Sequence, residues 1–276
     1  MKDIPKKNFK LPLPGETGLG VRPKDAGISL NRFISQTGFC SRREADKLID
    51  AGRVTINGSA AKSGNRVMTG ELVLVDGETL KQSSQTVYIA FNKPPGVSST
   101  TDLKDKDNII DFIKYPLRIF PIGRLDKASE GLIFLTNDGD IVNKILRAGN
   151  RHEKEYIVTV DKPITKDFIY KMSNGIKILD TVTQKCRVTQ QSTFVFKIIL
   201  TQGLNRQIRR MCAALNYKVK RLVRTRIMTI TLQNIAAGKW RPFSQDEIEH
   251  IHQLIQDSSK TKEASLIYSN NESFNE

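Results

Sequence analysis

Six consecutive polar residues, 81–86, separate two stretches of chain whose apolar patterns differ. A run of this composition has little apolar surface to bury, so it is typical of a linker. The stretch before it, 28–80, is about fifty residues long, which is near the minimum for a domain that folds alone. The stretch after it, 87–255, is long enough to bury a larger core. The sequence therefore predicts two domains of unequal size.

The two ends of the chain lack a periodic apolar pattern. Residues 1–27 are rich in Pro and Gly, and residues 256–276 are rich in Ser and charged side chains. Segments of this kind cannot bury enough apolar surface to offset the entropy lost on ordering. We expect an extended or disordered lead and a disordered tail, and the basic lead could touch nucleic acid.

The sequence pattern of the smaller domain predicts a helix–helix–strand module. Apolar residues recur at helical spacing over 30–34, and Ser41 followed by Glu44 forms a capping box for a second helix. Residues 54–56 have strand character and end in the Asn-Gly pair 57–58, which favours a tight turn.

The larger predicted domain mixes strands and helices without regular alternation. Strands are predicted at 87–92, 131–136, 155–160, 193–201 and 217–223. Helices are predicted at 138–147, 165–173, 205–215 and 244–255, the last opening with a second capping box. Irregular order favours an α+β fold with a mostly antiparallel central sheet over a doubly wound parallel one.

The chain is strongly basic, with 44 Lys and Arg against 29 Asp and Glu and a net charge of +15. No apolar run approaches the ~18 residues that a membrane span requires. Residues 203–228 hold eight basic side chains and no acid, which is +8 of the total: Arg206, Arg209, Arg210, Lys218, Lys220, Arg221, Arg224 and Arg226. A solvated helix face is the alternative, but such faces normally interleave acids. The pattern favours a nucleic-acid partner.

The cysteines and histidines exclude two other kinds of site. Cys40, Cys186 and Cys212 are far apart and odd in number, which argues against a disulfide framework and fits a reducing cytoplasm. The three His show no metal-ligand spacing. The sequence predicts a cytoplasmic protein without a zinc site.

Four ordered motifs carry more information than composition does. Residues 123–139 read G-R-L-D-K-A-S-E-G-L-I-F-L-T-N-D-G, and residues 203–211 read G-L-N-R-Q-I-R-R-M. Residues 92–97 read N-K-P-P-G-V, and residues 154–158 read K-E-Y-I-V. Together they resemble the pseudouridine synthases of the small-ribosomal-RNA type, whose catalytic loop reads G-R-L-D-x-x-S-E-G-L. The 28–80 module is similar to the RNA-binding domain named after the fourth protein of the small ribosomal subunit.

The resemblance implies roles for four residues around one carboxylate. Asp126 would be the catalytic group, acting as nucleophile or as base at the sugar. Arg209 would pair with that carboxylate and keep it ionised. Tyr156 would stack on the target base, and Ile208 would pack against the base site. Without the motifs, Asp126 would read as a turn residue and the others as ordinary packing.

The resemblance also leaves room for RNA contacts. Arg124 is placed to fill the space of a nucleotide that is flipped out for reaction. Lys93 either touches a phosphate or simply precedes a tight Pro-Pro-Gly turn, and the sequence leaves both open. Further RNA-binding candidates, chosen by charge on or beside predicted helices, are Arg32, Arg42, Arg43, Lys47, Arg206 and Arg210.

The reaction that the resemblance implies is isomerisation of uridine to pseudouridine, which requires neither redox change nor group donor, so no cofactor and no metal are expected. Residues 144–156 and 224–228 are most similar to members that modify 23S ribosomal RNA. Alternatives are a 16S ribosomal RNA or transfer RNA target, or a non-catalytic RNA-binding assembly factor. A glycosidase, with Glu130 as second carboxylate, is disfavoured. We expect a monomer that does not bind membranes.

Overall fold

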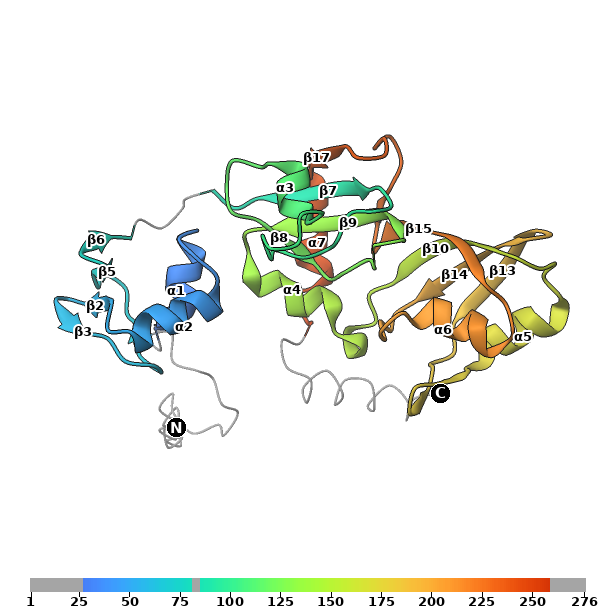
Figure 1. Ribbon diagram of the computed structural model, residues 1–276, viewed down its shortest axis with the longest axis horizontal. Coiled ribbons are helices and arrows are strands. Elements are labelled where there is room, and N and C mark those ends of the chain that lie inside the picture. The colour runs from blue at the N-terminus through green and yellow to red at the C-terminus, as the bar shows by residue number, and fades with distance from the viewer. Residues whose placement is uncertain (1–26, 81–84, 259–276) are drawn as a thin grey trace, which may run out of the picture. The chain divides into compact units, whose positions relative to one another are not determined.

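The computed structural model describes residues 27–80 and 85–258, and Figure 1 shows its helices and strands. The expected lead and tail lie outside these residues, apart from Gly27 and 256–258. The chain divides into two compact units, Met1–Lys81 and Gln82–Glu276, called unit 1 and unit 2 below. No helix within 27–80 or 85–258 is long and apolar enough to cross a membrane.

Unit 1 contains helices α1 (Leu30–Gln36) and α2 (Arg42–Asp50) with two small antiparallel sheets. One sheet has the strand order β3-β2-β5-β6, and the other pairs β1 with β4. The strands are β1 (Ile28–Ser29), β2 (Val54–Ile56), β3 (Ser59–Ala60), β4 (Arg66–Val67), β5 (Val73–Val75) and β6 (Glu78–Thr79). Apolar side chains of both helices and of β2, β4 and β5 form one buried cluster.

Local interactions that the sequence predicts are present in unit 1. The Ser41 hydroxyl accepts from the Glu44 backbone N–H at 3.2 Å, and the Glu44 carboxylate accepts from the Ser41 N–H at 2.7 Å. This capping box satisfies two helix-end donors that would otherwise have no partner. Asn57 and Gly58 adopt φ of 49° and 81°, as a tight hairpin turn requires. Both local predictions are confirmed.

Unit 2 is built on a mixed sheet that has nine strands among the described residues. Its main path runs β13-β14-β10-β15-β9-β7-β17, with β16 beside β15 and β8 beside β9. These strands are β7 (Tyr88–Lys93), β8 (Phe120–Ile122), β9 (Glu130–Thr136), β10 (Lys154–Val160), β13 (Arg187–Ser192), β14 (Val195–Leu200), β15 (Val219–Ile227), β16 (Ile230–Thr231) and β17 (Trp240–Pro242). A separate hairpin pairs β11 (Lys177–Ile178) with β12 (Thr181–Val182).

One pairing in this sheet is parallel, that of β15 with β9, and the other described pairings are antiparallel. The expected α+β fold with a mostly antiparallel sheet is confirmed. At the parallel crossing Gly131 lies opposite Arg224, with φ of +106°. A Cβ at this glycine would lie 2.3 Å from the Arg224 carbonyl oxygen, so only glycine lets the two strands approach this closely.

Helices cover both faces of the sheet (Figure 1). Alternate residues of β7 and β9 point to opposite faces, where α4 and α7 cover one and α3 covers the other. Apolar residues of α5 and α6 pack against β10, β13, β14 and β15. The helices are α3 (Ile109–Ile113), α4 (Gly139–Leu146), α5 (Lys166–Asn174), α6 (Gln207–Ala214) and α7 (Gln245–Leu254), with a 3₁₀ turn at Ala148–Asn150.

The strand predicted at 193–201 is present as β14 (Val195–Leu200). Its hairpin partner β13 was not predicted, because its mainly polar, exposed residues carry little apolar signal. The strand predicted at 217–223 is observed as β15, Val219–Ile227. Its pairing with β10 keeps the basic residues after 223 in an extended conformation. Helix α3 and strand β8 were not predicted, because five and three residues are too few to show a period.

Candidate active site

The loop that carries Asp126 joins β8 to β9. Leu125 is buried, and the Ser99 hydroxyl holds its backbone by accepting from its N–H and donating to its carbonyl oxygen, both at 3.1 Å. The Lys127 carbonyl oxygen accepts from the Gly96 N–H at 2.7 Å. The backbone is therefore fixed on both sides of Asp126, whose half-buried carboxylate faces open space.

That space is a cavity of about 330 Å³. It brings together Asp126, Tyr156, Ile208, Arg209 and Arg124, the five residues that the sequence predicts at the active site. They come from the β8–β9 loop, from β10 and from the N-terminal end of α6, which are far apart in the chain. A cavity of this size and mixed lining suits a small polar ring.

Arg209 does not form the expected ion pair with Asp126: no contact within 4.0 Å joins the two in the described chain. Its guanidinium instead donates to the Ala128 carbonyl oxygen at 3.3 Å, the Ser129 hydroxyl at 3.1 Å and the Val219 carbonyl oxygen at 3.4 Å. Burial lowers the pKa of Arg209, and the nearby Asp126 acts in the opposite direction. Arg209 therefore braces the segment that follows Asp126 and influences the carboxylate through space.

Tyr156 and Ile208 form the apolar part of the cavity. Tyr156 is half-buried on β10, directly opposite Arg224 of β15, and Ile208 is buried in the first turn of α6. Helix α6 starts after Arg206, which is in the left-handed region with φ of 50°. Inside that turn, the Gln207 side-chain oxygen accepts from the Leu204 N–H at 3.0 Å and fixes the loop above the cavity.

Of the two interpretations that the sequence left open for Lys93, the structure favours the tight turn over the phosphate contact. Its side chain is 0% exposed, and its ammonium donates to the carbonyl oxygens of Pro94 and Val97, both at 2.9 Å. Burial lowers its pKa to about 8. Lys93 therefore stabilises the turn that follows β7, which was the other reading of this motif.

Two other basic candidates of unit 2, Arg124 and Arg206, are exposed and line the cavity. Arg210 is exposed one turn into α6 and does not line the cavity; it donates to the Asn205 carbonyl and side-chain oxygens. Arg124, Asp126 and Asn205 also line a second cavity of about 330 Å³. The exposed arginines can therefore reach an RNA backbone beside the carboxylate.

The basic candidates of unit 1 lie on its two helices. Arg42, Arg43 and Lys47 are exposed on α2, and Arg32 is half-buried on α1. Their exposure leaves the three α2 side chains accessible to a polyanion.

Glu130, the second carboxylate that a glycosidase would need, is occupied elsewhere. It accepts two hydrogen bonds from Arg221, at 2.7 and 3.0 Å. These bonds are the main cause of its lowered pKa, so the group stays ionised and is unsuited to act as a general acid.

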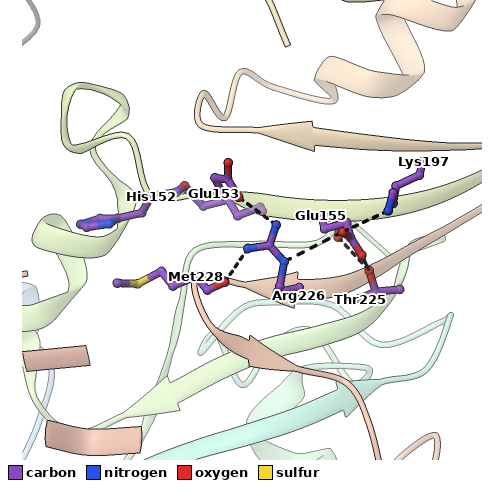
Figure 2. A network of polar contacts seen from close by, with 8 residues as sticks. His152, Glu153, Glu155, Lys197, Thr225, Arg226 and Met228 are labelled. Carbon is purple, nitrogen blue, oxygen red and sulfur yellow. Dashed lines mark hydrogen bonds and ion pairs between the residues drawn. The ribbon is translucent and has the colours of Figure 1, made fainter. Parts of the chain in front are cut away.

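Polar contacts fix the register of β10 and β15, the strands on one side of the cavity (Figure 2). Arg226 donates to the Glu153 carboxylate at 2.8 Å and to the Met228 carbonyl oxygen at 2.6 Å. The Thr225 hydroxyl donates to the Glu155 carboxylate at 2.9 Å. Of these residues, Glu155 lies between the cavity-lining positions Lys154 and Tyr156 of β10.

The cavity residues that were missed as site residues include Ser129, Lys154 and Arg224. All three are buried. One signal was available, because Lys154 and Tyr156 are two residues apart on a strand and therefore share a face. No comparable signal marks Arg224, because its position depends on the parallel pairing with β9.

Within 27–80 and 85–258, no three His, Cys, Asp or Glu side chains lie close enough together to hold a metal ion. The chemistry available at the site is therefore that of one carboxylate surrounded by cationic and apolar side chains.

Comparison with protein families gives two matches. Residues 87–214 match the model described as RNA pseudouridylate synthase, and residues 29–73 match the S4 domain.

Individual relatives agree with this. The chain is 55% identical over 237 residues to the dual-specificity RNA pseudouridine synthase RluF of Escherichia coli (strain K12), covering 85% of this chain and 82% of the relative. It is 31% identical to the ribosomal large subunit pseudouridine synthase B of Bacillus subtilis (strain 168), covering 82% and 96% respectively. A crystal structure of a pseudouridylate synthase superposes with a TM-score of 0.61 at 29% identity, covering 82% of this chain and all of the other.

Proposed function

The chain belongs to the RNA pseudouridine synthases of the RsuA type, which carry an S4 domain, and we propose that it isomerises uridine to pseudouridine in 23S ribosomal RNA. The observation that carries the site assignment is the cavity in which Asp126 meets Tyr156, Ile208 and Arg209. A relative with 55% identity over most of the chain supports the activity.

Asp126 acts on the sugar of the target nucleotide. The reaction breaks the bond between N1 of uracil and C1′ of ribose, rotates the base, and joins C5 to C1′. C5 loses a proton and N1 gains one, so atoms balance without a cofactor. Asp126 serves either as a nucleophile at C1′ or as a base on the sugar, and both roles need an ionised carboxylate with a fixed backbone.

The remaining cavity residues hold the base and the carboxylate. Tyr156 stacks on the uracil, and Ile208 packs against it. Arg209 acts as a positioning residue, because its hydrogen bonds go to the residues directly after Asp126. The second candidate role, direct pairing with Asp126, would need the guanidinium to move to the carboxylate when RNA binds.

The target nucleotide has to leave its helix before reaction, because the sugar and base are otherwise covered by stacking. Arg124, exposed at the mouth of the cavity, fills the vacated place by stacking and by pairing with phosphate. Arg206 and Arg210 contact neighbouring phosphates, and Arg32, Arg42, Arg43 and Lys47 of unit 1 contact structured RNA.

Ribosomal RNA of the large subunit is the preferred target because one relative is named for it. A second substrate, a transfer RNA or 16S ribosomal RNA, is the alternative, and the dual specificity in another relative's name favours it. A non-catalytic assembly factor is disfavoured, because such a protein has no chemical need for Asp126, Tyr156 and Arg209 around one cavity. We place the protein in the cytoplasm, where ribosomal RNA is found, and propose that it acts as a monomer.

The test is to map pseudouridines in total RNA from cells with and without this protein, and with the Asp126→Asn variant in its place. We expect one or a few pseudouridines in 23S ribosomal RNA to disappear in the deletion and to stay absent with the variant. An unchanged pseudouridine map would contradict the proposed function, and losses confined to transfer RNA or 16S ribosomal RNA would contradict the target.

A further inference from the structure

Unit 2 buries three cationic side chains without an acidic partner. Lys93, Lys154 and Arg224 are 0%, 6% and 4% exposed, and none of them forms an ion pair among the residues described. Burying an unpaired charge is costly, so proteins retain it where it has a use. The Lys93 ammonium stabilises a turn by donating to two backbone carbonyl oxygens. Lys154 and Arg224 have a different environment, because they line the cavity.

Both cavity cations have hydrogen-bond donors left over. Lys154 has three N–H donors, and one hydrogen bond is present, to the His152 carbonyl oxygen at 2.9 Å. Arg224 donates from Nε to the Leu132 carbonyl oxygen at 2.6 Å, while its Nη2 is buried with no partner in the described structure. Buried donors normally have partners, so an acceptor is missing from this wall of the cavity.

The two side chains act on the same small region. Burial, followed by repulsion from Arg224, lowers the pKa of Lys154 to about 8, so the two cations are near neighbours. Lys154 shares a strand face with Tyr156, and Arg224 lies opposite Tyr156 in the sheet register. A base stacked on Tyr156 therefore presents its edge to both cations.

We propose that Lys154 and Arg224 donate hydrogen bonds to the carbonyl oxygens of the flipped uracil and stabilise its negative charge after the glycosidic bond breaks. This inference rests on the proposed function. When the N1–C1′ bond breaks, its electron pair stays on the base and spreads from N1 onto O2 and O4. Donors already aimed at those oxygens in a water-poor cavity favour that charge without having to reorganise.

Depth favours the base over a phosphate as the partner. The cations that can follow an RNA backbone are exposed: Arg124 and Arg206 line the cavity, and Arg210 lies one turn into α6, outside the lining. Lys154 and Arg224 are almost fully buried, where a ring can enter but a continuous backbone cannot easily follow. Lys154 and Arg224 therefore contact the reacting base, and the exposed arginines contact the RNA backbone.

The experiment pairs enzyme variants with sulfur-substituted RNA. Three synthetic RNA fragments carry uridine, 2-thiouridine or 4-thiouridine at the position that the pseudouridine map identifies, because sulfur accepts hydrogen bonds much more weakly than oxygen. Single-turnover rates at saturating enzyme are measured for the wild type, Lys154→Met and Arg224→Lys. Lys171→Met is the matched control, because Lys171 is 53% exposed, pairs with Asp167 and lies outside the cavity.

We expect Lys154→Met to slow conversion of the uridine fragment by about 10²–10³-fold, the usual effect of losing one donor to a developing anion. At least one sulfur substitution should slow the wild type by about tenfold or more. The ratio of the uridine rate to the thiouridine rate should fall toward one in the variant that lacks the matching donor. Lys171→Met should keep the wild-type rates and sulfur effects. The melting temperature of Lys154→Met should equal or exceed that of the wild type, because a buried charge is removed.

Sulfur effects of equal size in the wild type and in both cavity variants would overturn the inference. So would variants that weaken RNA binding and its salt dependence but keep the saturated rate, since the cations would then meet phosphate. If Lys154→Met does not fold, Arg224→Lys decides alone, because it keeps the charge and removes the donor fork. A wild-type enzyme that converts no uridine would instead refute the proposed function.

Discussion

The two units differ in what they bury. In unit 1 the described core is apolar throughout, and its basic side chains on α2 are exposed. In unit 2 the interior also contains nine polar or charged residues, among them Lys93, Lys154, Arg224 and Ser129, whereas none is buried in the described part of unit 1. Attraction to a polyanion needs only surface charge, but chemistry on a base needs polar groups held inside a dry cavity.

This difference in burial affects the stability of each unit as well as its function. Surface charges on α2 are solvated and destabilise the fold little. Buried polar groups of unit 2 require hydrogen-bond partners or a ligand, and they lower stability where these are missing. Changes to the buried polar groups of unit 2 should therefore affect turnover and stability, while changes to the exposed cations of α2 should affect RNA affinity alone.

The sharpest test of this division is Asp126→Asn. The substitution keeps size and hydrogen bonding but removes the charge and nucleophilicity of the side chain. We expect turnover to fall by about 10⁴–10⁶-fold, as when a nucleophile is lost in other enzymes. RNA affinity should change by less than about tenfold, because exposed cations supply most of it. Near-normal single-turnover rates would remove Asp126 from the mechanism.

Arg209 and Arg210 allow the same comparison within one helix. They are adjacent and equally charged, but Arg209 is half-buried and bonded to the loop after Asp126, whereas Arg210 is exposed. Arg209→Ala should lower kcat strongly and reduce the free energy of unfolding by about 1–3 kcal/mol through lost hydrogen bonds. Arg210→Ala should instead reduce the slope of log affinity against log salt by about one unit.

The measurements are single-turnover rates at saturating enzyme and urea unfolding curves for both variants. Equal effects on the saturated rate would show that the basic side chains act collectively on RNA, and the bracing role of Arg209 would be withdrawn.

Removal of unit 1 tests its role in docking. A protein that begins at Gln85 should keep Asp126-dependent activity at high RNA concentration, because the whole cavity lies within unit 2. KM should rise, and each lost phosphate contact of Arg42, Arg43 or Lys47 should reduce the salt slope by about one unit. An unchanged KM together with an unchanged salt slope would mean that unit 1 has another task.

The smallest expected effect concerns Lys93, whose burial lowers its pKa to about 8 from an ordinary 10.5. Below pH 8 the folded protein bears the cost of a buried charge, and that cost fades as the pH rises toward 10.5, where the unfolded chain also loses the proton. The wild type should therefore gain stability relative to Lys93→Met between pH 8 and 10.5, by at most about 3 kcal/mol.

Urea unfolding of both proteins at pH 7 and pH 10 measures this difference, and RNA affinity serves as the control. A pH-independent difference in stability would place the ammonium in solvent. A loss of RNA affinity in Lys93→Met would support a phosphate contact of Lys93 and contradict its role in the turn.

Local sequence patterns were enough for most elements. The capping boxes of α2 and α7, the Asn-Gly turn of unit 1 and the apolar strands β7, β9 and β10 depend on residues close in sequence. Short or polar elements such as α3, β8 and β13 carry too few apolar residues to show a period, so neighbouring segments decide them.

The sequence by itself also predicted that Asp126, Tyr156, Ile208, Arg209 and Arg124 belong to one site, because motifs mark them, and all five line one cavity. Only the tertiary structure decided which cations are buried and which are exposed. That outcome depends on the close parallel crossing of β9 and β15 at Gly131, which places Arg224 beside the cavity, and on the turn that buries Lys93. The burial of a side chain depends on the residues packed around it, so a run of basic residues in the sequence does not show which of them are buried.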